Sequence, residues 1–258
     1  MAKVDMNRLG GLQWVRRTNG QLSRSERLRL FGAIVRSAIP TTTGLARSVI
    51  GWLPQGARDV DARDFSPPTS RIAREAEDVC ALLPGGLAMH SYRTWMLGLA
   101  LAAADGCKTM DEDLFFCAAL LHDYGLMHPT SCVDFALAGA NRAMSCAREA
   151  GLPDASAEAL GDGICVHPTV GISAGRDGAI GYYVQWGAMA DIGGLRMWDI
   201  APANQHEVYR RYPRERTFGK TCAALIQAEA VAVPRGRFAF YAHLGMPALV
   251  RLTARGPR

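Results

Sequence analysis

The chain reads Ala118-Ala119-Leu120-Leu121-His122-Asp123-Tyr124-Gly125 where an apolar run meets two adjacent side chains that can bind metals. Neighbouring side chains on a helix point about 100° apart, so His122 and Asp123 can reach one ion only where the helix ends. Gly125 indicates such an end, because glycine readily takes the left-handed conformation found at many helix C-termini. The stretch therefore predicts a helix that stops at a His-Asp doublet.

The segments around this doublet predict helices and no strands. An apolar, almost uncharged run over Leu87–Ala104 predicts a nearly buried central helix. Acidic residues at 111–113 favour the N-terminal end of the helix that leads to His122. Small residues between Ala179 and Gly193 predict a thin helix suited to close packing, with Asp191 near its end. No alternating pattern extends over five residues, so we expect an all-α fold with further helices over 69–83, 134–150, 154–166, 203–211 and 217–231.

Three regions are expected along the 258 residues. Residues 1–75 predict an N-terminal helical extension packed on the core, since they carry too much apolar surface for a free tail. Within it, Pro40 is expected to separate two short helices, Ser23–Ser37 and Thr43–Leu53. Residues 76–233 form the expected main domain, and residues 234–258 form a C-terminal segment.

Composition argues for a cytoplasmic protein of ordinary globular type. The net charge is +5 without any run of five like charges, which does not suit a nucleic-acid polymer as partner. Seven cysteines without a C-x-x-C pair indicate reduced thiols. The apolar stretch Leu30–Leu53 contains Arg36, Arg47 and Pro40, so no membrane span is expected, and a helix lying on a membrane surface is the less favoured alternative. No secretory signal is visible.

Two histidines and two aspartates on three expected helices form the candidate metal site: His90, His122, Asp123 and Asp191. A mixed nitrogen and oxygen set suits one divalent ion such as Zn, Fe or Mn, with positions left for water. Such an ion lowers the pKa of bound water and can supply a nucleophile at neutral pH. Asp191 is singled out because a carboxylate on an apolar helix is costly to bury unless it is paired or coordinating.

The motifs His90-Ser91-Tyr92-Arg93-Thr94-Trp95, Ala119–Leu126 and Ala190-Asp191-Ile192-Gly193 resemble the H…HD…D pattern of the HD-domain superfamily. Within it, they are similar to the branch that includes cyanamide hydratases, with supporting matches at 135–140, 166–167 and 212–214. The resemblance covers about residues 70–220. It implies an all-helical bundle of a metal-dependent hydrolase, with His90, His122, Asp123 and Asp191 as ligands.

Three residues are candidates for catalytic roles beside the ligands. Asp123 can act as general base on the activated water. Arg93, one helical turn after His90, can bind a substrate anion or pair with a carboxylate such as Asp123. His167 is expected behind the metal ligands or facing the substrate, with a backbone-bonded core histidine as the alternative. Two-metal members of the superfamily carry more histidines before the last aspartate. Since this chain offers only His167 and the loop residue His128, one metal is expected.

Several functions fit this sequence. The first is a hydrolase in which activated water attacks a small, nucleotide-like phosphoester, and the second is a hydratase that adds water to cyanamide or a nitrile. A metal-bearing binding protein without turnover and a two-metal oxygenase are further alternatives. A small-molecule substrate and a homo-oligomer are compatible with each. A phosphate substrate requires several cationic contacts, so a pocket without Arg or Lys beyond Arg93 would count against the phosphohydrolase.

Overall fold

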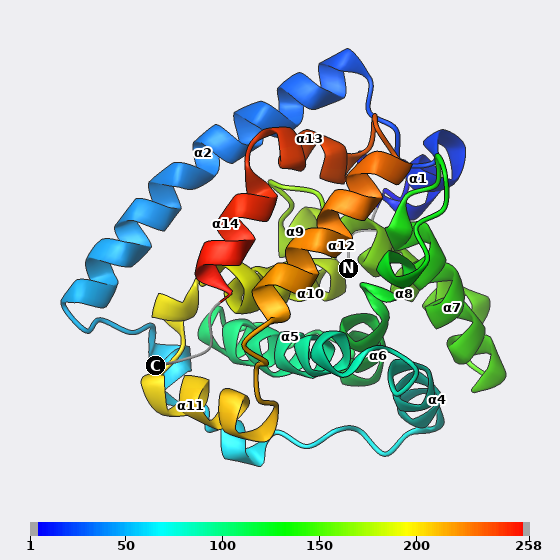
Figure 1. Cartoon of the computed structure of the whole chain (residues 1–258). Helices are drawn as coiled ribbons and strands as arrows, with labels where there is room; N and C mark the ends of the chain where they lie inside the picture. The colour runs from blue at the N-terminus through cyan, green and yellow to red at the C-terminus, as the bar shows by residue number, and fades with distance from the viewer. Residues whose placement is uncertain (1–4, 255–258) are drawn as a thin grey trace.

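A computed structural model describes residues 5–254 and contains only helices among its named elements (Figure 1). Within this range, 14 α-helices and three short 3-10 helices follow one another, and no strand occurs. This confirms the all-α fold. None of the helices is long and apolar enough to cross a membrane.

The centre of the fold is the pair formed by α5 (Gly85–Ala104) and α10 (Ala179–Gly193). A Cβ at Gly187 of α10 would lie 2.2 Å from the carbonyl oxygen of Thr94 on α5. A Cβ at Gly98 of α5 would likewise lie 2.8 Å from the carbonyl oxygen of Tyr183. The two backbones therefore touch, as the small residues predict, and this contact brings the side chains of α5 against Asp191.

Helices α4 (Arg71–Cys80), α6 (Glu112–Leu121), α7 (Phe135–Glu149) and α8 (Asp154–Val166) surround this pair and agree with the predicted segments. The Asp111 carboxylate caps α6 by accepting from the amide of Leu114 at 3.0 Å, and Asp134 caps α7 in the same way. From Phe115 to Leu121 every side chain of α6 is fully buried. The hydrophobic core therefore leads directly to the doublet.

The N-terminal region comprises α1 (Leu12–Thr18), α2 (Arg24–Val49), α3 (Gln55–Arg58) and the 3-10 turn η1 (Ala62–Asp64). Helix α1 packs on α8, where the amide of Leu12 donates to the Asp162 carboxylate at 2.8 Å. The guanidinium of Arg8 pairs with Asp162 and with Asp177. Arg8 and Leu12 thus fix this part of the chain to the body, while the expected domain boundary at residue 75 stays a prediction.

The prediction of two helices around Pro40 is wrong, because α2 runs through it as one helix along the outside of the molecule (Figure 1). Proline removes one hydrogen bond and crowds the preceding turn, but it need not end a helix whose neighbouring turns are held. Ser37 and Thr41 flank Pro40, and their hydroxyls donate to the carbonyls of Ile34 and Ser37. Gly44 then lets the helix lie against Trp198 of the 3-10 turn η3 (Met197–Asp199).

The C-terminal part consists of α11 (Pro202–Arg211), α12 (Phe218–Ala232), α13 (Arg237–His243) and α14 (Met246–Thr253). The first two agree with predicted helices, and the short α13 and α14 were not predicted. The buried Arg237 anchors α13 by pairing with Asp134 at 2.9 Å and donating to the carbonyl of Cys165 at 2.7 Å. Between α8 and α10 the chain forms one further short helix, α9 (Ala174–Asp177).

Candidate metal centre

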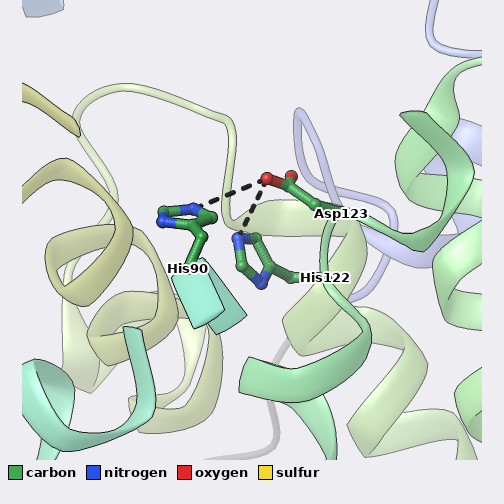
Figure 2. A group of neighbouring side chains, drawn as sticks. All are labelled: His90, His122 and Asp123. Carbon is green, nitrogen blue, oxygen red and sulfur yellow. Dashed lines mark ion pairs between the residues drawn. The ribbon is translucent and has the colours of Figure 1, made fainter. Parts of the chain in front are cut away.

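Three buried side chains converge in front of α5 and the end of α6 (Figure 2). His90, His122 and Asp123 each offer a ligand atom, and these atoms lie within 4.8 Å of one another. The Nε2 atoms of His90 and His122 lie 3.6 and 3.3 Å from Oδ2 of Asp123. Two imidazoles and one carboxylate at such spacing are able to hold a single metal ion.

The doublet converges because α6 ends at Leu121, immediately before it. His122 keeps helical angles, whereas Asp123 turns out of the helix at φ −102° and ψ 7° and starts the 3-10 turn η2 (Tyr124–Met127). The predicted helix end is therefore present. The left-handed role expected for Gly125 is wrong, because its φ is not positive. Its backbone instead approaches α7, where a Cβ would lie 2.0 Å from the carbonyl oxygen of Phe135.

Three histidines are oriented by a hydrogen bond between Nδ1 and an oxygen atom of the protein. Nδ1 of His122 donates to the carbonyl of Ala119 at 2.8 Å, and Nδ1 of His167 donates to the carbonyl of Ile164 at 2.6 Å. Both residues stand at helix ends, where such carbonyls lack intrahelical partners. Nδ1 of His90 lies 2.7 Å from Oδ2 of Asp191. Since Nδ1 carries the hydrogen in each case, Nε2 is left as the acceptor that a metal needs.

His167 faces the same space as the three converging residues. Its Nε2 lies 4.0 Å from Oδ1 of Asp123, and its ring centroid lies 5.0 Å from that of His122. Gln185 of α10 fixes the backbone at His167 and Thr169 by donating to their carbonyls at 2.5 and 2.8 Å. The sequence indicated His167 but not Gln185. By contrast, His128 is exposed and takes no part in the cavity beside the site.

Asp191 lies behind His90 and outside the converging set. Its Oδ2 accepts from His90, and its Oδ1 accepts from Nε of Arg93 at 2.8 Å, from the hydroxyl of Tyr209 at 3.2 Å and from Arg214. Arg93, predicted to bind a substrate anion or a carboxylate, is fully buried and pairs with Asp191 rather than Asp123. A direct metal bond from Asp191 stays a prediction, whereas its hydrogen bond to His90 is present.

Burial and neighbouring charges set the protonation of the site. Burial opposes ionisation of Asp123, but the adjacent His122 outweighs it and holds the pKa of the carboxyl well below its usual value. Burial likewise lowers the pKa of His90, and together with the nearby His122 it lowers the pKa of His167 to about 3. The Nε2 of His122 is buried without a hydrogen bond among the described residues. Burial opposes protonation of His122, but the charge of Asp123 outweighs it and raises the pKa of this imidazole. An ionised carboxylate surrounded by three imidazoles, of which His90 and His167 are held neutral, fits a divalent metal.

A cavity of about 330 Å³ opens in front of these residues. Its inner end contains His90, His122, Asp123 and His167, and its walls come mainly from α10, α12, α13 and α14. Apolar side chains make up most of these walls, and no Lys, Arg or Glu is found among the described lining residues. Comparison with protein-family models and with curated proteins found no match to this chain. The HD-domain resemblance therefore stays a prediction based on the motifs.

Proposed function

We propose that the chain is a metal-dependent enzyme that adds activated water to an uncharged carbon electrophile of the nitrile or cyanamide type. One observation carries this proposal. The three converging groups lie at the inner end of a cavity that has no cationic side chain among its described lining residues. Such a cavity suits a neutral substrate next to an activated water.

His90, His122 and Asp123 would hold the ion, since these are the groups whose ligand atoms converge. A divalent ion such as Zn, Fe or Mn, bound by three protein groups, keeps positions open, lowers the pKa of bound water and polarises a substrate nitrogen or oxygen. Asp191 orients His90 through Nδ1, as carboxylates commonly do for ligating histidines.

His167 supplies a neutral hydrogen-bond acceptor that would orient the attacking water. Its Nδ1 hydrogen is held by the carbonyl of Ile164, so Nε2 is free to accept a hydrogen bond from that water. Addition of water to a nitrile replaces the two carbon–nitrogen π bonds by the C=O bond of an amide and two N–H bonds. Both water protons end on the amide nitrogen, so no group leaves.

The phosphoester alternative rests on the resemblance to HD-domain hydrolases. A phosphate group requires cationic or multiple N–H contacts in addition to a metal. Arg93 and Arg214, which lie close to the site, both donate to Asp191. The cavity therefore favours an uncharged substrate. Turnover of a phosphoester, without turnover of a nitrile or cyanamide, would favour the phosphohydrolase over the hydratase.

Metal analysis tests the first part of the proposal. In His122→Ala and Asp123→Ala we expect loss of the metal measured by elemental analysis, with unchanged helical circular dichroism. His128→Ala is the control, because that exposed histidine lies outside the cavity. Full metal content in either site variant would contradict the assignment. The metal-loaded protein is then assayed with nitriles, cyanamide and phosphoesters, and a protein that binds metal but turns over none of them is a binding protein.

A further inference from the structure

The cavity is much larger and more apolar than the proposed reaction needs. Cyanamide has only three heavy atoms, whereas about 330 Å³ lies within the range of roughly 300–1,000 Å³ typical of sites for drug-sized ligands. Most of that space lies beyond the metal-binding side chains. The walls of the cavity therefore indicate the chemistry of the part of the substrate that lies beyond its reactive group.

The apolar walls include side chains from five helices. They include one side chain of α2, two of α10 and one each of α12, α13 and α14, namely Ile34, Met189, Ile192, Ile226, Phe238 and Leu249. Ile192, Ile226 and Phe238 are buried in the fold, and Leu249 is half exposed at the outer end. The cavity thus runs from a polar inner end to a partly exposed apolar outer end.

Apart from the side chains at the metal centre, the lining contains the polar groups of Ser37, Gln185, Trp186 and Tyr241. The amide of Gln185 and the hydroxyls of Ser37 and Tyr241 already donate to backbone carbonyls. Among the described lining residues, this leaves the indole N–H of Trp186 as a donor. Few groups remain to recognise a polar or charged body along the walls. Burying apolar surface contributes about 25 cal/mol per Å². Affinity in such a cavity must therefore come chiefly from the apolar body of the ligand.

We infer that the substrate is a neutral amphiphile whose reactive carbon reaches the metal centre and whose alkyl or aryl body fills the apolar cavity. The assignment of the reactive end rests on the proposed function, whereas binding of the apolar body does not. Small polar nitriles and cyanamide would then be bound weakly. The preferred class is a nitrile carrying a long chain or a ring.

Chain-length dependence of binding tests this inference. Straight-chain nitriles from propionitrile to decanenitrile are titrated into metal-loaded and metal-depleted protein, with calorimetry and tryptophan fluorescence as readouts, since Trp186 lines the cavity. We expect affinity to rise about three- to fourfold for each methylene until the cavity is full. This trend should persist without metal. Affinity that does not change with chain length would overturn the inference.

Two substitutions on α14 provide a matched pair. Leu249 lines the cavity and is half exposed, whereas Leu252 lies on the same helix, is 63% exposed and does not line the cavity. Leu249→Asp should weaken binding of the longer nitriles about tenfold or more, and Leu252→Asp should leave it unchanged. Equal behaviour of the two variants would contradict the inference.

Filling the inner part of the cavity gives a second test that does not depend on the outer end. Ala188 of α10 lines the cavity and is buried, so Ala188→Leu should shorten the chain length at which affinity stops rising. An unchanged profile in a folded variant would count against the inference. Chain-length-dependent binding without turnover would leave the cavity assignment in place and reject the proposed reaction. Turnover of short nitriles, without binding that depends on chain length, would support the proposed reaction and reject the cavity assignment.

Discussion

Asp191 shows how one carboxylate serves two neighbours at once. Its Oδ2 receives the Nδ1 hydrogen of His90, and its Oδ1 receives donors from Arg93, Tyr209 and Arg214. Burial opposes its ionisation, but the Arg93 charge and the His90 hydrogen bond hold the pKa of Asp191 well below its usual value. The carboxylate therefore stays charged, and it fixes both the orientation of His90 and the tautomer that leaves Nε2 free.

Asp191→Asn tests this role. Loss of a carboxylate that orients a ligating histidine typically weakens metal binding about 10–100-fold, so the variant should still bind metal in a competition titration with a chromophoric chelator. It should also be less stable by about 3 kcal/mol on denaturant unfolding, because two buried guanidinium groups lose their negative partner. Asp105→Asn, which alters an exposed aspartate paired with Arg196, is the control. Complete loss of metal binding would instead make Asp191 a direct ligand.

Glu229 on α12 is a buried carboxyl whose ionisation opposes folding. Burial raises its pKa to about 7, with a further contribution from Asp134 and opposition from the amide of Phe135 and from Arg237. Between the unfolded pKa of 4.5 and about 7 the folded state binds the extra proton. Stability from this group is therefore present at low pH and lost as pH rises through about 7.

Glu229→Gln should remove this pH dependence while keeping the oxygen that accepts from the amide of Phe135. We expect the wild type to lose on the order of 1–2 kcal/mol relative to the variant between about pH 5 and pH 8. Denaturant unfolding of both proteins at the two pH values measures the difference. Equal pH dependence of the two proteins would show that Glu229 does not titrate in this window.

At the scale of helices, periodicity predicted the elements that carry the site, and caps predicted where several of them begin. The apolar run to Leu121 and the small residues of α10 are strong signals, because burial on all sides leaves a long uninterrupted pattern. Helices α1, α13 and α14 contain only seven, seven and eight residues, too few for a periodic pattern to stand out. The continuity of α2 through Pro40 depends on local hydroxyl contacts that residue type alone does not reveal.

The contact between α5 and α10 sets the position of His90 relative to Asp191. Gly187→Ala would place a Cβ 2.2 Å from the Thr94 carbonyl oxygen, so the helices must separate. Overpacking of this kind costs about 1–3 kcal/mol, and we expect a matching loss of stability together with weaker metal binding. Gly193→Ala on the same helix is the control, since its Cβ would meet only side chains at 3.6 Å or more. Similar effects of both substitutions would contradict this account.

Across the whole molecule, the site was predictable in its composition but not in its surroundings. His90, His122 and Asp123 converge as the sequence indicated, since ligand-type residues on buried helices stand out from an apolar background. The cavity in front of them was not predicted, because its walls come from α2, α10 and α12–α14, which meet only through tertiary packing. Tyr209 and Arg214 were missed as partners of Asp191 for the same reason, since α11 and the residues after it reach Asp191 only through tertiary packing.

Two hydrophobic clusters hold the helices around the site, a large one through the central helices and a smaller one that joins α12–α14 to α7 and α10. Since both consist of apolar side chains, the fold should persist without an ion. An ion held by His90, His122 and Asp123 would nevertheless link the first turns of α5 to the end of α6 and would bind only the folded state. At a metal concentration about 100 times the Kd it would add about 2.7 kcal/mol to the free energy of unfolding. For a chain of this size the melting temperature should rise by about 5–10 °C.

Calorimetric unfolding of metal-loaded and chelator-treated protein measures this shift, and far-ultraviolet circular dichroism should show the same helix content in both. His122→Ala is the matched control, because it keeps the core and lacks one of the converging nitrogens. It should melt at the same temperature with and without added metal. A metal-dependent shift of equal size in His122→Ala would place the stabilising ion elsewhere on the chain. Since the ligands come from separate helices, a shift confined to the wild type would show that the ion bridges them.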